Sequence, residues 1–153
     1  VGSMGHASSV ALGIALEKPE RKVVALDGDS ACMMHMGAMT MVSKLDVPNF
    51  MHVVLNNGSH ESVGGQPSAG HKVDFTKIAE ACDYATVGHP VTTEVELMEA
   101  LEVLRNCGKA SFIDCRIHKG LSRKLPPVIF DHREVIDALI DNLNESRITM
   151  DKK

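Results

Sequence analysis

Hydrophobic and small residues recur at helical spacing near the start of the chain and then give way to a short apolar run. Residues 5–18 place such positions three and four apart, and Pro19 cannot continue a helix, so a helix is predicted there. Residues 22–29, KVVALDGD, hold the aliphatic run 23–26 shortly before a turn at Gly28. This run predicts a buried strand that leads into a tight turn.

The next segment combines an almost uncharged helix pattern with a second strand pattern. Residues 31–45 contain five methionines, which is typical of a helix packed on several sides, and Pro48 ends this segment. Residues 50–57, FMHVVLNN, predict a second buried strand. Residues 58–75 are rich in Gly, Pro and Ser and predict a loop of unusual length.

Helix and strand patterns continue to alternate after this loop. The predicted elements are a helix at 74–82, a strand at 84–88, a helix at 94–106 and a strand at 110–117. Strands that are separated by helices pair in parallel, and the helices cover both faces of the sheet. We therefore predict an α/β fold with three layers and a doubly wound, mostly parallel sheet.

Length and composition predict a single domain. The chain has 153 residues and is 44% hydrophobic, which suffices for one core and is too short for two. We expect this domain to cover residues 1–120. Residues 121–153 are predicted to hold the end of an extended linker (119–131), an amphipathic helix at 132–143 and a frayed tail.

Charge and cysteine content narrow the class of protein. A net charge of −4 gives no basic patch of the kind that nucleic-acid binders carry, and no apolar run is long enough to span a bilayer. The four cysteines show no CxxC spacing and are expected to be reduced and buried, so we expect a cytoplasmic protein. The start at Val1 carries no signal-peptide pattern and is expected to lie inside a longer polypeptide.

Polar residues follow two neighbouring strands of the predicted sheet. Asp27-Gly28-Asp29-Ser30 opens a helix, where backbone N–H groups favour an anion such as a phosphate. A carboxylate beside a phosphate requires a cation between them, and Mg²⁺ prefers hard oxygens such as those of the Asn56-Asn57 pair. Each motif alone is an ordinary turn sequence. Together, at two adjacent strand ends, they predict a metal and diphosphate site.

The spacing of these motifs resembles a known signature. Gly28-Asp29-Ser30, followed after 25 residues by Asn56-Asn57, resembles the GDG-(about 25)-NN motif of thiamine-diphosphate enzymes, with Ser30 in place of the last glycine. The stretches GSMGHASS and TMVSKLDVPNFMHVVLNNGSHESVGGQP are similar to phosphonopyruvate decarboxylases and, less closely, to sulfopyruvate decarboxylases. The resemblance covers residues 1–120 and implies the thiamin diphosphate-binding fold without its first strand.

The resemblance also implies roles for individual residues. The Mg²⁺ ligands would be the side chains of Asp29 and Asn57 and the carbonyl of Ser59. Ser30 and Ala31 would lie against the diphosphate, next to Gly28. The rings of the cofactor would meet Gly2, Ser3 and Met4. The Gly2 carbonyl would accept a hydrogen bond from the 4′-amino group, and Met4 would be the apolar wedge that bends the cofactor. The alternative interpretation of Met4 is a core methionine.

The implied reaction is the decarboxylation of a 2-oxo acid, here phosphonopyruvate to phosphonoacetaldehyde and CO2. The cofactor carries the difficult electronic step, and the protein holds it, keeps the site dry and protonates the product. His6 and His60 are candidate catalytic residues for substrate contact, and Glu61 is a weaker acid/base candidate. Structural roles are the alternative for all three, and His35 and His52 are expected to be core histidines.

The family pattern is incomplete in this chain. The glutamate that activates the cofactor belongs to a pyrimidine-binding domain, which does not fit within 153 residues. We therefore expect half of an active site, completed by a pyrimidine-binding domain of the same or a neighbouring subunit, in a homo-oligomer with exposed apolar surface on each isolated chain. A sulfopyruvate decarboxylase subunit and a non-catalytic diphosphate-binding module are the alternatives; the absence of GxGxxG after the first strand argues against a dinucleotide.

Overall fold

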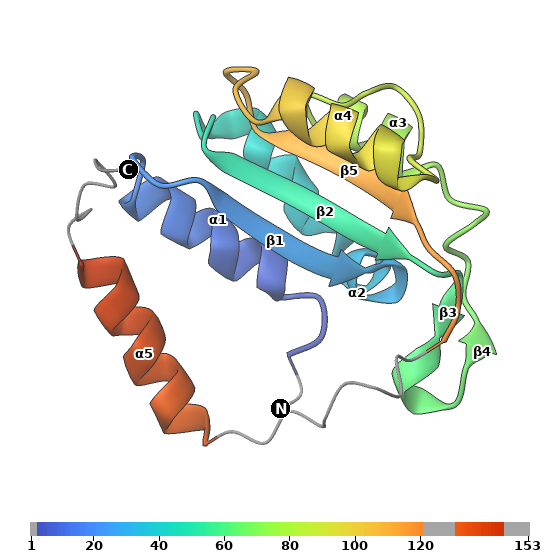
Figure 1. Cartoon of the computed structure of the whole chain (residues 1–153), viewed down its shortest axis with the longest axis horizontal. Coiled ribbons are helices and arrows are strands. Elements are labelled where there is room, and N and C mark those ends of the chain that lie inside the picture. The colour runs from blue at the N-terminus through green and yellow to red at the C-terminus, as the bar shows by residue number, and fades with distance from the viewer. Residues whose placement is uncertain (1–2, 121–130, 146–153) are drawn as a thin grey trace. The chain divides into compact units, whose positions relative to one another are not determined.

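A parallel sheet forms the centre of the molecule. The computed structural model describes residues 3–120 and 131–145, in one unit that ends at Gly120 and a second that holds helix α5 (His132–Asn144). Strands β1 (Val23–Gly28), β2 (Phe50–Asn56) and β5 (Ser111–Arg116) pair in parallel in the order β1-β2-β5 (Figure 1). The predicted parallel sheet is therefore confirmed.

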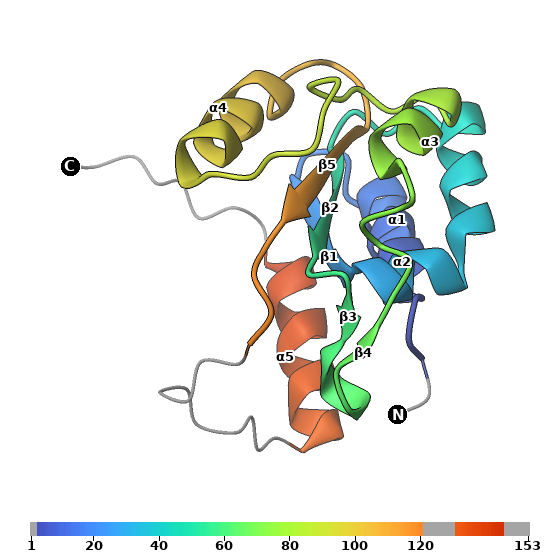
Figure 2. The ribbon, with the colours of Figure 1, turned by 90° about the vertical axis from the view of Figure 1, so that its right-hand side faces the viewer.

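Helices cover both faces of this sheet, as predicted. One face packs against α1 (Ala7–Glu17), α2 (Asp29–Met34), the 3₁₀ helix η1 (Met36–Lys44) and α3 (Phe75–Ala81). The other face packs against α4 (Glu94–Leu104) (Figure 2). This is the three-layer α/β arrangement.

The two layers follow from the alternation of side chains along β2. Phe50 and Val54 belong to the core beneath α1 and α3, whereas Met51 and Val53 belong to the core beneath α4. Successive residues of a strand point to opposite faces, so an uninterrupted apolar run is what a strand covered on both sides requires.

The α4 side of β1 is left uncovered. Val24 and Leu26 are 51% and 63% exposed, and a groove of about 930 Å³ opens between β1, β2 and α4. This surface agrees with the expectation of exposed apolar residues. No helix among the described residues is long and apolar enough to cross a membrane.

The predicted helix at 31–45 is wrong in its extent and type. The α-helix begins earlier, at Asp29, and stops at Met34, because His35 adopts φ −129° and ψ 37°. The rest is the 3₁₀ helix η1, in which the Thr40 and Ser43 hydroxyls donate to carbonyls three residues back. Such side-chain bonds compete with the α-helical pattern, and propensity arguments do not include them.

The predicted strand at 84–88 is also wrong. Only Ala85 and the later Val91 form isolated parallel bridges to β5, at Ser111 and Cys115. Between them Gly88 has a φ of +81° and Pro90 lacks an N–H, so the ladder cannot run on.

The other elements lie within two residues of their predicted bounds, apart from the long loop. That loop contains the strands β3 (Ser59–His60) and β4 (Gln66–Pro67), which pair antiparallel around the 3₁₀ turn η2 (Glu61–Val63). Helix α5 matches the predicted helix at 132–143. Residues 121–130 of the predicted linker and residues 146–153 of the predicted tail lie outside the described residues.

Candidate cofactor site

The predicted metal ligands gather at the carboxyl edge of the sheet. Asp29 follows β1 directly, and Asn57 follows β2. The register pairs Gly28 with Leu55, which brings these two strand ends level, and β3, which begins with Ser59, packs against α2. The β3–β4 hairpin lies beyond the ends of β2 and β5 (Figure 1). Ligands of open parallel sheets bind at this edge.

The Asn57 side chain is oriented by hydrogen bonds at both its amide oxygen and its amide nitrogen. Its Oδ1 accepts a hydrogen bond from the Ser59 N–H at 3.0 Å, and its Nδ2 donates to Glu61 Oε2 at 3.3 Å. Glu61 Oε2 also accepts from the Gly120 N–H at 3.2 Å. Glu61 therefore orients Asn57, a contact that the sequence did not indicate.

The start of α2 offers an unsatisfied donor. Ser30 is 8% exposed, and its buried Oγ has no hydrogen-bond partner within the described part of the chain. A buried hydroxyl without a partner is costly, so this position fits an oxygen-rich ligand such as a diphosphate. The neighbouring Ala31 is half-buried at the same helix start.

Three buried carboxylates, those of Asp27, Asp29 and Asp114, lie near this edge of the sheet. Burial, together with the charges of Asp27, Asp114 and Asp29, raises the pKa of the Cys32 thiol to about 12. The carboxylates that oppose a thiolate there would stabilise a positive ion. Asp29 is itself 2% exposed, and no salt bridge to it is present among the described residues. The donor set of one carboxylate, one amide and one carbonyl suits Mg²⁺.

The described residues contain no group of three or more His, Cys, Asp or Glu side chains that could hold a metal. A site with Asp29 as its single carboxylate does not require such a group, because an amide oxygen and a backbone carbonyl complete the predicted set. To hold a metal, these residues would need further ligands, which phosphate oxygens could supply.

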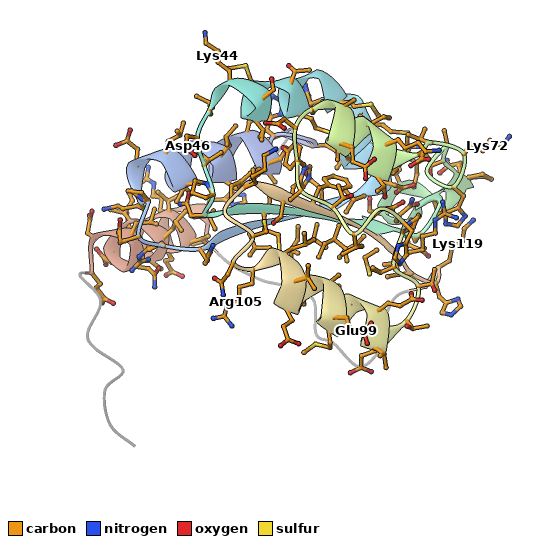
Figure 3. All side chains as sticks on the ribbon, turned by 90° about the horizontal axis from the view of Figure 1, so that it is seen from above. Lys44, Asp46, Lys72, Glu99, Arg105 and Lys119 are labelled. Carbon is orange, nitrogen blue, oxygen red and sulfur yellow. The ribbon has the colours of Figure 1, made fainter. Side chains whose placement is uncertain are left out.

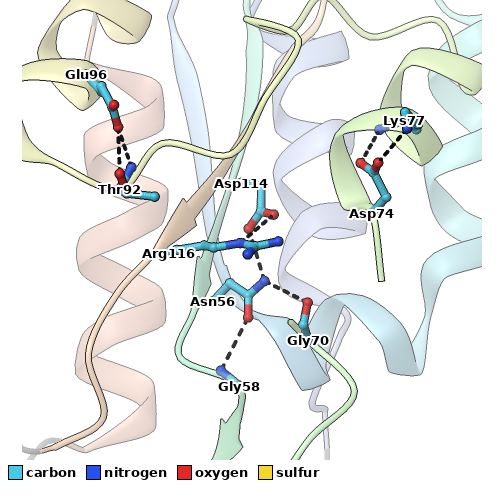
Figure 4. A network of polar contacts seen from close by, with 9 residues as sticks. All are labelled: Asn56, Gly58, Gly70, Asp74, Lys77, Thr92, Glu96, Asp114 and Arg116. Atoms are coloured by element: carbon cyan, nitrogen blue, oxygen red, sulfur yellow. Dashed lines mark hydrogen bonds and ion pairs between the residues drawn. The ribbon is translucent and has the colours of Figure 1, made fainter. Parts of the chain in front are cut away.

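Asn56 has a different function from Asn57. It is fully buried, and its Nδ2 donates to the Gly70 carbonyl at 2.9 Å and to Asp114 Oδ1 at 3.1 Å (Figure 4). Its Oδ1 accepts from the Gly58 N–H at 3.3 Å. Asn56 thus ties both ends of the 58–70 loop to the end of β5, and its hydrogen-bonding groups are used within the protein.

Asp114 should make the stability of the chain depend on pH. Burial raises the pKa of its carboxyl, against the smaller effects of the Asn56 hydrogen bond and the Arg116 charge. Because the folded state then binds a proton before the unfolded state does, the contribution of Asp114 to the free energy of unfolding rises as pH falls through the folded pKa.

We expect Asp114→Asn to remove that rise, whatever the effect of the substitution on the free energy of unfolding at neutral pH. Urea unfolding between about pH 7 and pH 4 would measure the difference from wild type at each pH. Asp46→Asn, at an exposed carboxylate, is the control and should follow the wild-type profile. Parallel profiles for Asp114→Asn and wild type would contradict the assigned origin.

The N-terminal loop lies against α2. A Cβ at Gly5, which has a φ of +86°, would come within 2.7 Å of the Ala31 carbonyl, so only glycine fits there. Ser3 and Met4 precede it and are exposed, and the 49% exposure of Met4 excludes a core role in the described chain. Gly2 lies outside the described residues. The loop that carries Ser3 and Met4 therefore approaches the start of α2 at Gly5.

The candidate histidines lie on separate elements. His6 is the exposed residue before α1, and its ring contacts that of His35 in a tilted arrangement, with centroids 4.1 Å apart and the ring planes at 53°. His60 is half-buried in β3. The prediction that His35 is a core histidine is wrong, because it is exposed at the break after α2. His52 is a core histidine, 1% exposed, and its Nε2 lies 2.9 Å from Asp27 Oδ2.

Sequence reasoning missed Ser68, Gly70 and Asp114. The Ser68 hydroxyl donates to Asp29 Oδ2, and Gly70 has no room for a Cβ between Asp29 and Asn56. The only local signal was the glycine and serine content of a long loop, which does not indicate what the loop contacts. Asp114 lies in a strand pattern, where a lone acidic residue is a weak signal of function.

Comparison with known protein families agrees with the class that this fold and site define, an α/β domain that binds a diphosphate at the carboxyl ends of its strands. Residues 1–115 match the family model of the thiamine pyrophosphate enzyme C-terminal TPP binding domain. The chain therefore belongs to the thiamine pyrophosphate enzymes, and the predicted family and cofactor class are confirmed.

The relatives of this chain include named decarboxylases. The chain is 43% identical over 101 residues to a phosphonopyruvate decarboxylase of Streptomyces viridochromogenes. The aligned region covers 66% of this chain and 25% of the relative. It is 30% identical over 140 residues to the sulfopyruvate decarboxylase subunit beta of Methanocaldococcus jannaschii, covering 87% of this chain and 72% of that subunit. The chain thus spans only about a quarter of the phosphonopyruvate decarboxylase.

A solved structure supports the fold. A thiamine diphosphate-dependent 4-hydroxybenzoylformate decarboxylase of Rhodococcus jostii RHA1 superimposes with a TM-score of 0.64 at 19% identity, covering 78% of this chain and 24% of that one. At this identity the likeness concerns the arrangement of the sheet and helices alone.

Proposed function

We propose that this chain is the thiamine diphosphate- and Mg²⁺-binding half of a phosphonopyruvate decarboxylase. The observation that carries the proposal is the convergence of Asp29, the oriented Asn57 and the unsatisfied Ser30 hydroxyl at adjacent strand ends. The substrate follows from the 43% identity to a phosphonopyruvate decarboxylase, the highest identity among the relatives described above.

The residues of this chain would divide the work of binding. Asp29 and Asn57, with the Ser59 carbonyl, would hold Mg²⁺, and Ser30 and Ala31 would meet the diphosphate next to Gly28. When bound, thiamine diphosphate supplies the nucleophilic carbon and the electron sink for the loss of CO2.

The N-terminal residues would hold the rest of the cofactor. Gly2 and Ser3 would adjoin its aminopyrimidine, and Met4 would provide apolar bulk beneath it. The exposure of Met4 fits this role, because a wedge must project from the domain toward its ligand.

Two histidines would serve the substrate. His6 and His60, from the loop before α1 and from β3, would donate hydrogen bonds or a proton to the oxo acid and its phosphonate. The β3–β4 hairpin that carries His60 would exclude water from the edge of the sheet when the site is assembled.

The proposed assembly requires a second domain. A pyrimidine-binding domain of the same or a neighbouring subunit would supply the activating glutamate, in a homo-oligomeric, cytoplasmic enzyme. The uncovered apolar surface on β1 supports burial against further protein, since exposed patches of this kind mark interaction sites.

A sulfopyruvate decarboxylase subunit is the second candidate. The observation that favours it is coverage, because the chain matches 72% of the M. jannaschii beta subunit. A non-catalytic diphosphate-binding module is the remaining alternative, and it predicts cofactor binding without turnover.

The test is CO2 release by the complete polypeptide or subunit pair that contains this chain, with Mg²⁺, thiamine diphosphate and either phosphonopyruvate or sulfopyruvate. Turnover of phosphonopyruvate alone is the expected result. Turnover of sulfopyruvate alone would assign the second candidate. Cofactor binding without turnover of either acid would overturn both substrate assignments and favour the binding module.

A further inference from the structure

The carboxylate of Asp29 is held by a loop residue that is distant in sequence. The Ser68 hydroxyl, 39 residues away, donates a hydrogen bond to Asp29 Oδ2. Ser68 Oγ in turn accepts the N–H of Gly70 at 3.1 Å. A serine hydroxyl has a single proton, so the Gly70 bond leaves that proton directed at the carboxylate.

The position of Ser68 is fixed by contacts other than its bond to Asp29. The Ser68 N–H donates to the Gly58 carbonyl at 3.0 Å, and the Gly70 carbonyl accepts from Asn56 Nδ2 at 2.9 Å. A Cβ added to Gly70 would lie 2.5 Å from Asn56 Oδ1, so the backbone passes as close to the strand ends as glycine permits. The hydroxyl is therefore brought to Asp29 by a segment that Gly58 and Asn56 anchor at the end of β2.

We propose that Ser68 is a positioning residue for the metal carboxylate, holding Asp29 Oδ2 by its hydroxyl proton and leaving the other carboxylate oxygen for the cation. The inference rests on the proposed function, because it assigns Ser68 a role toward the Mg²⁺ that Asp29 would bind. Metal-binding carboxylates are commonly hydrogen-bonded by such outer partners, which fix their orientation. Asp29 is 2% exposed, so water has little access to replace the serine.

A purely structural role for Ser68 predicts a different result. If the hydroxyl only anchors the loop, its loss lowers the melting temperature without metal and leaves the metal affinity of the folded chain unchanged. The positioning role predicts weaker metal binding by folded protein.

The experiment uses the complete polypeptide or subunit pair that contains this chain. It measures the Kd of Mn²⁺, as a spectroscopic substitute for Mg²⁺, by electron paramagnetic resonance in the presence of thiamine diphosphate. The chain has no tryptophan and one tyrosine, so intrinsic fluorescence would report poorly. We expect Ser68→Ala to raise this Kd about 10- to 100-fold. Ser68→Thr should keep the hydroxyl and bind like wild type. Ser62→Ala, at an exposed serine of the same hairpin, is the matched control.

The outcomes separate this inference from the proposed function. Wild-type affinity in folded Ser68→Ala would overturn the positioning role alone. If wild type itself binds no Mn²⁺ with thiamine diphosphate, the proposed function fails and the inference with it. If Ser68→Ala does not fold, Ser68→Thr is compared with Ser68→Val, in which a methyl group replaces the hydroxyl. Equal Kd values for these two variants would overturn the proposal. Weak binding by Ser68→Val, with wild-type binding by Ser68→Thr, would support it.

Discussion

Asp29→Ala is expected to weaken the metal-dependent binding of thiamine diphosphate severely. Asp29 would be the only carboxylate ligand, and its loss would leave the diphosphate without a bridging cation beside the buried Asp27 and Asp114. Outer partners of metal ligands change affinity about 10- to 100-fold, so removal of a direct ligand should weaken binding by on the order of 100-fold or more. Isothermal titration with thiamine diphosphate, with and without Mg²⁺, would measure the loss.

Asp46→Ala is the matched control for this substitution. Asp46 is an exposed carboxylate that precedes β2, at the edge of the sheet opposite Asp29, and Figure 3 shows it far from Lys72 of the 58–75 loop. It should bind the cofactor as wild type does, and removal of Mg²⁺ by a chelator should reproduce the Asp29→Ala result. Unchanged affinity in Asp29→Ala would refute the assignment of the metal site.

His52→Leu is expected to cost about 3–5 kcal/mol of unfolding free energy, the usual effect of leaving a buried charged partner alone. His52 Nε2 lies 2.9 Å from Asp27 Oδ2, with the two side chains 1% and 4% exposed. Leucine fills the space of the ring without supplying a hydrogen bond, so Asp27 would lose its partner in the core. Urea unfolding of the variant and the wild type would measure the loss.

The double variant Asp27→Leu/His52→Leu tests the cause. If the loss comes from the unpaired carboxylate, removing both partners should cost less than removing His52 alone, because apolar replacement of a whole buried pair is often near neutral. His89→Leu, at an exposed histidine, is the control and should change stability little. A loss in the double variant as large as that in His52→Leu, or larger, would indicate that ring packing, and not the pair, stabilises this part of the core.

The regular part of the fold could be predicted because burial patterns there follow simple periods. Most of the run Phe50–Asn56 is apolar, and its residues pack into the cores on both faces of the sheet. The predictions of secondary structure were wrong where tertiary contacts or single backbone angles determine the local structure. His35 breaks a helix that composition favours, and Ala85 contacts β5 only as an isolated bridge.

The site could be predicted in outline for a similar reason. Asp29 and Asn57 follow adjacent strands, so the sequence determines that they share an edge of the sheet. Ser68 and Asp114 reach the same edge from a loop and a later strand, and their roles depend on contacts across 39 and 58 residues. No local pattern encodes such contacts, and the placement of Asn56 inside the network became evident only with them.

The burial of Cys32 has a practical consequence for labelling. A thiol whose pKa is raised to about 12 is almost entirely protonated at neutral pH and reacts slowly with electrophiles such as maleimides. Cys115 is buried and its pKa is also raised by burial, whereas Cys107 is exposed in the turn before β5. That turn lies at the edge of the sheet opposite the cofactor residues, so a dye on Cys107 could follow assembly with a partner domain without touching the site.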